Sequence, residues 1–220
     1  MALAIFDLDN TLLDGDSDYL WGQFLVRKGI VDGPSYTAEN RRFLAEYEAG
    51  RLDIREFLRF QLRPLAENDP ATLHDWHTEY LRDDILPVIL AAGRERIADH
   101  AARGDTLMII TATNRFITGP IAEELGIPHL LATEVEIVDG RYTGNSTGTP
   151  CFRDGKVTRL EEWLATNHAD LDGSWFYSDS HNDLPLLQRV DHPIAVDPDK
   201  TLRAHAERVG WEILSFRTPA

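Results

Sequence analysis

The stretch Ala2-Leu3-Ala4-Ile5-Phe6-Asp7-Leu8-Asp9-Asn10-Thr11-Leu12 decides the fold, because an apolar run there ends in two closely spaced carboxylates. A short apolar run bounded by polar residues is typical of a strand buried in a parallel sheet. A second such run, Trp175-Phe176-Tyr177, ends in Ser178-Asp179-Ser180-His181-Asn182-Asp183. Parallel strands place their carboxyl ends along one edge of a sheet, so we expect the aspartates at these two strand ends to lie in one crevice.

The segments between these two runs carry further strand and helix patterns. A strand is expected at residues 106–110, and its end leads into Thr111-Ala112-Thr113-Asn114-Arg115. A short apolar run at 129–131 precedes two strands, 135–138 and 141–143, which flank the hairpin signal Asp139-Gly140. Helical patterns alternate with these strands, and one of them opens at Lys156. This alternation predicts an α/β fold with a mainly parallel sheet.

The region from residue 15 to residue 87 differs from the rest, because helical patterns replace the strand-like runs. Asp53 begins a variant capping box for a helix that we expect Pro64 to end. Asp69-Pro70 is typical of an N-cap followed by proline at the first helical position. We therefore predict a helical unit at 15–87, inserted between core segments 1–14 and 88–220.

The net charge of −15 in 220 residues bounds the choice of partners. A field of that sign repels polyanions, so we expect neither nucleic acid nor an anionic membrane as a partner. A phosphate ligand would need local cations, and Lys156 and Arg115 are the candidates.

No apolar segment approaches a membrane-spanning length, and the run at 2–6 is too short for a signal peptide, so we expect a cytoplasmic location. The single cysteine, Cys151, fits a reducing compartment and is expected to be a small packed side chain.

The aspartates at the two strand ends also predict a metal. Carboxylates packed that closely repel one another unless a cation lies among them. Ligands that offer only oxygen favour a hard ion such as Mg2+. The sequence therefore predicts a Mg2+ site at this edge of the sheet before it indicates a reaction.

Four motifs follow one another along the chain: Asp7-x-Asp9-x-Thr11, Thr111 after a middle strand, Lys156 at a helix start, and Asp179 with Asp183. Together they resemble those of the haloacid dehalogenase-like superfamily of phosphohydrolases. The resemblance implies a Rossmann-like three-layer core, and the helices at 15–87 resemble the C1 cap of its phosphoserine phosphatase group. The segments 111–116, 149–152 and 177–185 resemble the histidinol-phosphatase-like members of subfamily IB.

The resemblance implies a role for each aspartate. Asp7 would be the nucleophile that accepts the phosphoryl group, which splits hydrolysis into two displacements. Asp9, two residues on and on the same face, would be the acid–base group. Mg2+ would be held by Asp7, the Asp9 carbonyl and Asp179, with Asp183 supporting the site.

The resemblance also implies the groups that bind phosphate. Lys156 would supply a second positive charge to the phosphoryl group and counts as a third catalytic residue. The Thr111 hydroxyl would donate to a phosphoryl oxygen. Ala112 and Asn182 complete the expected phosphate-binding set.

The departures from the family pattern bear on the substrate. Ala112-Thr113 stands where phosphoserine phosphatases carry a Gly-Gly pair, which weakens phosphoserine as the substrate. Asp16 falls where that group binds the substrate amine, and it could equally be the N-cap of a helix. Arg115 could contact phosphate or substrate, or form an ion pair at the surface. We expect a small phosphorylated amino alcohol, with histidinol phosphate leading, then phosphoserine, then broad activity on small phosphorylated metabolites.

A different class of protein also offers an acidic Mg2+ pocket, namely a non-enzymatic receiver-like module that is phosphorylated on an aspartate as a signal. Such a module needs a long-lived acyl phosphate and no lid. This chain carries Asp9 beside the nucleophile and a helical cover at 15–87, which favours an enzyme.

Overall fold

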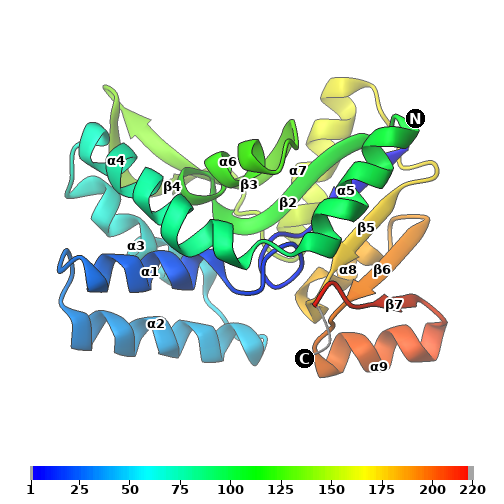
Figure 1. Cartoon of the computed structure of the whole chain (residues 1–220), viewed down its shortest axis with the longest axis horizontal. Coiled ribbons are helices and arrows are strands. Elements are labelled where there is room, and N and C mark those ends of the chain that lie inside the picture. The colour runs from blue at the N-terminus through cyan, green and yellow to red at the C-terminus, as the bar shows by residue number, and fades with distance from the viewer. Residues whose placement is uncertain (1, 218–220) are drawn as a thin grey trace.

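The computed structural model describes residues 2–217, so residues 1 and 218–220 of the predicted core lie outside the described part. Its centre is a seven-stranded sheet of order β4-β3-β2-β1-β5-β6-β7 (Figure 1). All neighbouring strands are parallel except β3 and β4. The strands are β1 (Leu3–Phe6), β2 (Thr106–Asn114), β3 (His129–Val138), β4 (Arg141–Thr147), β5 (Trp175–Ser178), β6 (His192–Val196) and β7 (Glu212–Leu214). The predicted α/β fold with a mainly parallel sheet is confirmed.

Helices cover both faces of this sheet. Successive side chains of a strand point to opposite faces, so Ala4 and Phe6 enter one hydrophobic core while Leu3 and Ile5 enter the other. The core helices are α5 (Ala91–Arg103), α6 (Arg115–Glu124), α7 (Asp154–Asn167), α8 (Leu184–Leu187) and α9 (Lys200–Val209). The predicted three layers are therefore present. Within the described residues, no helix has the length and apolar character needed to cross a membrane.

The chain between β1 and β2 begins with a set of helices that add no strand to the sheet. They are α1 (Ser17–Arg27), α2 (Gly33–Glu48), α3 (Ile54–Ala66) and α4 (Pro70–Tyr80), followed by a π-helical turn at Leu81–Ile85 and a 3-10 turn at Leu86–Val88. Each of the four α-helices follows an aspartate whose side chain caps it. Figure 1 shows these helices gathered at one end of the molecule, with α9 and β7 at the other.

The prediction that Pro64 ends the third helix is wrong, because α3 continues to Ala66. Proline removes one backbone donor, and here the loss falls in the last turn of the helix. The buried Leu65 packs with Leu58 and Leu62 and holds that turn in place. The side chain of Asn68 donates to the Pro64 carbonyl at 2.8 Å, which satisfies a group at the helix end.

The two ends of the inserted segment lie against each other. Leu13 and Ile89 form an antiparallel bridge. The Asp14 amide donates to the Val88 carbonyl at 2.7 Å, and the Leu90 amide donates to the Leu12 carbonyl at 2.9 Å. The helices therefore leave and re-enter the core at one place.

The β3–β4 hairpin reaches beyond the core and packs on the inserted helices. Asp139 and Gly140 both have positive φ, as the two-residue turn requires. A separate hydrophobic cluster joins Leu62 of α3 and Leu73 of α4 to Val135 of β3, among other residues. The expected strands at 129–131 and 135–138 are one strand, because β3 pairs with β2 at its start and with β4 at its end. Likewise β2 runs past residue 110 to Asn114, with an irregular register between Ile110 and Asn114.

Candidate active site

The predicted nucleophile, Asp7, follows the central strand of the sheet directly. Its amide continues the strand ladder by donating to the Tyr177 carbonyl at 2.9 Å. The chain then turns tightly, since the Thr11 and Leu12 amides both donate to the Leu8 carbonyl. Asn10 has a φ of 57° within this turn, a conformation that asparagine tolerates. The turn returns Thr11 toward the second group of aspartates.

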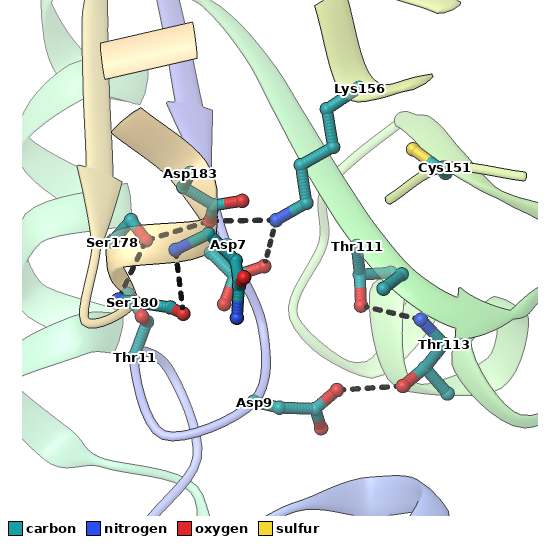
Figure 2. Close-up of polar contacts among 12 residues, drawn as sticks. Asp7, Asp9, Thr11, Thr111, Thr113, Cys151, Lys156, Ser178, Ser180 and Asp183 are labelled. Carbon is teal, nitrogen blue, oxygen red and sulfur yellow. Dashed lines mark hydrogen bonds and ion pairs between the residues drawn. The ribbon is translucent and has the colours of Figure 1, made fainter. Parts of the chain in front are cut away.

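Lys156, in the first turn of α7, joins Asp7 to Asp183. Its Nζ donates to Asp7 Oδ1 and to Asp183 Oδ2, each at 2.7 Å (Figure 2). The Ser178 hydroxyl donates to the same Asp183 oxygen at 2.7 Å. All three charged groups are at most 6% exposed, so this is a buried ion-pair network. The lysine is thus placed to meet an anion bound at Asp7.

A glycine lets Lys156 reach this position. The preceding residue, Gly155, lies so close to the turn before α7 that a Cβ there would be 2.0 Å from the Pro150 carbonyl oxygen. Its amide donates to the Phe152 carbonyl at 2.9 Å. Cys151 belongs to the same turn, and burial raises the pKa of its thiol to about 12. That cysteine is a packed side chain, as predicted from the sequence.

Burial dominates the electrostatics of this cluster. Burial raises the pKa of Asp7 to about 7, and Asp183 and Asp9 add to the rise while Lys156 opposes it. Burial, with Asp7 and Asp183 after it, holds the pKa of Asp179 well above its usual value. Burial disfavours the charged form of Lys156, but Asp183 and Asp7 outweigh it and hold the pKa of the ammonium well above its ordinary value. The lysine is therefore a permanent cation at neutral pH.

Thr11 fixes Asp179 from two sides. Its hydroxyl donates to Asp179 Oδ1, and the Asp179 amide donates to the same hydroxyl oxygen, both at 3.1 Å. These contacts join the loop after β1 to the loop after β5. The position of Thr11 in the first motif is explained by this link.

Asp9 lies on the other side of Asp7 and is held by two donors. The Ser17 amide donates to its Oδ1 at 2.7 Å. The Thr113 hydroxyl donates to its Oδ2 at 2.8 Å (Figure 2). The Thr113 amide donates to the Thr111 hydroxyl at 3.2 Å. The proton of the Thr111 hydroxyl is thereby left for another acceptor. Thr113, near the end of β2, thus orients both Asp9 and Thr111.

A cavity opens between these loops and the helices α1 to α3. It holds about 720 Å³ of space between protein atoms, part of it open to solvent. The predicted site residues that line it are Asp7, Asp9, Asp16, Thr111, Ala112, Lys156 and Asp183. The structure therefore brings together, in one cavity, most of the residues that the sequence indicated.

Three predicted site residues lie elsewhere. Asp179 and Asn182 line a neighbouring cavity on the β5 side. Arg115 lies outside both cavities, because its guanidinium makes two 2.8 Å bonds to the Glu134 carboxylate and a third to the Leu130 carbonyl. The fold gives Arg115 the ion-pair role that the sequence left open.

Asp16 combines both roles that its position suggested. Its side chain accepts from the Tyr19 amide at 2.8 Å and so caps α1, and the residue also lines the cavity. Burial, and after it the charge of Asp9, raises the pKa of Asp16 to about 7. A second carboxyl that the sequence patterns did not single out, Asp18, lines the cavity beside it and is 5% exposed. Its only sequence signal is a charged residue on the buried side of α1.

The end of α2 touches the core next to the site. The Tyr47 hydroxyl donates to Ser180 Oγ at 3.3 Å. Arg153 donates to the Gly50 carbonyl and, at 2.9 Å, to Asn182 Oδ1. These contacts join the inserted segment to the loops around the β5 end of the site.

The residues fit a divalent cation by charge. The carboxylates of Asp7, Asp179 and Asp183 share this region with one ammonium, that of Lys156. The excess is about two negative charges, which one divalent ion would balance, and every donor is oxygen. Among residues 2–217, no three His, Cys, Asp or Glu side chains form a ready-spaced metal cluster. Lys156 pairs with two of these carboxylates in the structure.

Comparison with known proteins defines the class of this fold and site. A family pattern described as "haloacid dehalogenase-like hydrolase" matches residues 4–188. The chain belongs to the haloacid dehalogenase-like hydrolases, as the order of its motifs predicted.

Individual relatives match over nearly the whole chain. A histidinol-phosphatase of Neisseria meningitidis serogroup C (strain 8013) is 44% identical over 219 residues, which cover 98% of this chain and 99% of that protein. Phosphoserine phosphatase SerB1 of Mycobacterium tuberculosis (strain ATCC 25618 / H37Rv) is 31% identical over 221 residues, 98% of this chain and 71% of that protein.

Solved structures agree with the assignment of the chain to this family. A protein of unknown function from Bordetella pertussis Tohama I has a TM-score of 0.93 and 43% identity, covering 98% of this chain and 99% of its own. A substrate-bound phosphoserine phosphatase has a TM-score of 0.72 at 18% identity, covering 98% and 93%, and shares the fold. The chain is thus a phosphatase of its family, and the receiver-like alternative is set aside.

Proposed function

We propose that this phosphatase hydrolyses the phosphomonoester of a small phosphorylated amino alcohol, histidinol phosphate, through a phosphorylated Asp7. The observation that carries the proposal is the charge pattern of the cavity. Lys156 pairs with Asp7 in the cavity lining, whereas Asp16 and Asp18 contribute carboxyls on either side of Ser17, whose amide donates to Asp9. A phosphate and an ammonium on one small molecule match this pattern. The identity to a histidinol-phosphatase supports the same substrate.

Phosphoserine fits the same pattern less well, because it carries a carboxylate besides its ammonium. Among the described residues that line the cavity, Lys156 is the only lysine or arginine, and it already pairs with Asp7 and Asp183. A substrate carboxylate would be desolvated there without a counter-charge, which is costly. The relatives that are phosphoserine phosphatases keep this substrate as the second candidate.

The contacts of Asp7 indicate which of its oxygens would attack phosphorus. Lys156 engages Asp7 Oδ1, so Oδ2 is the oxygen that can form the bond to phosphorus. The ester P–O bond breaks as this bond forms, and Asp9 gives its proton to the departing alkoxide. Water then attacks the phosphorus, Asp9 takes the proton from that water, and the bond to Asp7 breaks to release phosphate.

Donors around the phosphoryl group would stabilise its charge. The Thr111 hydroxyl and the Lys156 ammonium are placed for this, and both are buried, where such contacts are strongest. Asp7, the Asp9 carbonyl and Asp179 would hold Mg2+, with Asp183 supporting the site. When bound, the ion would neutralise charge on the transferring phosphoryl group.

We propose that residues 15–87 act as a cap over this site and select the alcohol. Helices α1 to α3 supply the cavity lining opposite the strand ends. The contacts of Tyr47 with Ser180 and of Arg153 with Gly50 join this segment to the core next to the site and support the cap role.

The test is phosphate release from histidinol phosphate, phosphoserine and p-nitrophenyl phosphate, each with Mg2+ and with EDTA. We expect the highest kcat/KM for histidinol phosphate, and loss of activity in EDTA that Mg2+ restores. Rapid-quench labelling should trap an acyl phosphate that Asp7→Asn abolishes. Histidinol phosphate turning over no faster than p-nitrophenyl phosphate would remove the amino-alcohol assignment.

A further inference from the structure

Two amide side chains are buried where the helix patterns call for apolar residues. On α2, Asn40 falls between Tyr36 and Phe43 on the buried face, and it is 3% exposed. On α3, Gln61 falls between Leu58 and Leu65 on the buried face, and it is 2% exposed. Buried amides cost free energy unless their donors and acceptors are satisfied, so each needs a reason to be there.

The two amides are only partly satisfied by the protein. The Tyr36 hydroxyl donates to Gln61 Oε1 at 3.0 Å, and Gln61 Nε2 donates to Asn40 Oδ1 over a long 3.4 Å. Asn40 Nδ2 is buried and has no partner among the described residues. A Cβ on Gly22 would be 2.6 Å from this nitrogen, so the bare glycine makes room for the amide.

Both amides line the same cavity as Asp7 and Lys156. Phe43 and Phe57 line it as well and supply aromatic surface next to the amides. Asp18 lines this cavity too. Burial, and after it the charge of Asp18, raises the pKa of Tyr36. The cavity lining therefore combines the Lys156 cation, the carboxyls of Asp16 and Asp18, and an amide pair together with aromatic rings.

We propose that Asn40 and Gln61 bind a nitrogen heterocycle on the leaving group, which for the function proposed above is the imidazole of histidinol phosphate. This inference rests on that proposed function and adds the residues that select the heterocycle. A neutral imidazole carries one N–H donor and one nitrogen acceptor. Each amide carries both a donor and an acceptor, and Asn40 Nδ2 is a donor still in need of an acceptor. The ring would lie against Phe43 and Phe57.

A purely structural role is the alternative, in which the amide pair only fixes the packing of α2 on α3. The two roles predict changes in different measured quantities. A structural role changes stability and affects all substrates alike. A recognition role changes the preference for a substrate that carries the heterocycle.

The experiment compares histidinol phosphate with ethanolamine phosphate, which keeps the ammonium and phosphate but lacks the ring. One variant is Asn40→Leu. The other is the double variant Tyr36→Phe with Gln61→Met, which removes both partners of the Tyr36–Gln61 hydrogen bond and costs Asn40 Oδ1 only its long 3.4 Å bond from Gln61. For each variant, the ratio of kcat/KM for histidinol phosphate to that for ethanolamine phosphate should fall about 10-fold to 100-fold, mainly through KM.

Gln23→Met is the matched control. Gln23 is a glutamine of α1 whose Nε2 is also buried without a partner among the described residues, but it does not line the cavity. Its replacement should leave both the activity and the substrate ratio of the protein within twofold.

The outcomes separate this inference from the proposed function. An unchanged ratio in the variants, with lowered thermal stability, would show a structural role and overturn the inference alone. If Asn40→Leu does not fold, the substrate ratio of the double variant decides between the two roles. If the unmodified protein prefers ethanolamine phosphate or does not distinguish the two, the histidinol phosphate assignment fails and this inference fails with it.

Discussion

Replacement of Lys156 by methionine tests the charge balance of the site most directly. Methionine keeps much of the length of lysine but removes the cation that lies 2.7 Å from both Asp7 and Asp183. Both carboxylates stay buried without an ion-pair partner, and Asp183 keeps only the hydrogen bond from Ser178 on its Oδ2. Removal of one partner of a buried ion pair costs about 3–5 kcal/mol. Asp7 can relieve the repulsion by taking up a proton, because its pKa is already raised to about 7. We therefore expect the lower bound, a loss of ~3 kcal/mol in the free energy of unfolding.

Thermal unfolding in EDTA and in Mg2+ measures this loss. For a chain of this size, ~3 kcal/mol corresponds to a fall in Tm of roughly 6–12 °C in EDTA. Added Mg2+ should recover part of it, since a cation that binds the native state replaces the missing charge. Loss of a preorganised donor to the phosphoryl group should also lower kcat about 100-fold to 1,000-fold.

Lys28→Met is the control, because Lys28 pairs with Glu79 at the surface at 2.8 Å. Exposed pairs contribute little, so its stability should stay within about 0.5 kcal/mol. An unchanged Tm of Lys156→Met in EDTA would refute the charge argument. A kcat within twofold of the unmodified protein would remove Lys156 from the phosphate site.

Three further predictions concern other parts of the molecule. Gly155→Ala forces a Cβ against the Pro150 carbonyl, so calorimetry should show a loss of about 1–3 kcal/mol together with reduced phosphate release. Asp16→Asn keeps the cap of α1 but loses a charge-assisted contact, so kcat/KM should fall about 10-fold to 150-fold for histidinol phosphate and not for p-nitrophenyl phosphate. Equal loss on both would assign Asp16 to the helix cap alone. Burial lowers the pKa of His100 although Asp105 opposes it, so the unfolded chain binds a proton that the native state resists and stability should fall as pH drops below ~6.5. Urea unfolding across pH 5 to 8 checks this, and a His100→Gln variant with an equally steep profile would contradict it.

The strand ends were predictable because their signal is local. An apolar run that stops at Asp7 indicates both the strand and the edge at which the carboxylate emerges. The helix caps at Asp53 and Asp69, and the alternative of a cap at Asp16, were predictable for the same reason, since each aspartate bonds an amide within three residues. The cap of α2 by Asp32 was not predicted. The contact of Lys156 with Asp7 spans 149 residues, and only the resemblance to a family indicated it.

The remaining site residues depend on how helices cross, which periodicity does not specify. In the sequence, Asn40 and Gln61 look like ordinary polar residues of amphipathic helices. Only the packing of α2 on α3 shows that both are buried and in contact. Arg115 looked like a site residue because it follows a strand that carries Thr111. Its partner Glu134 comes from β3, whose length exceeded the predicted short runs.

The packing of the β3–β4 hairpin on α3 and α4 has a consequence for how specificity can be exchanged between relatives. Gly144 of the hairpin lies so close to α3 that a Cβ there would be 3.1 Å from Ala66. The apolar faces of Leu62 and Leu73 are complementary to this particular hairpin. A chimaera that transplants residues 17–88 alone would set those faces against a foreign surface. Residues 129–147 would have to be transplanted together with residues 17–88. Two segments far apart in the chain therefore act as one exchangeable module.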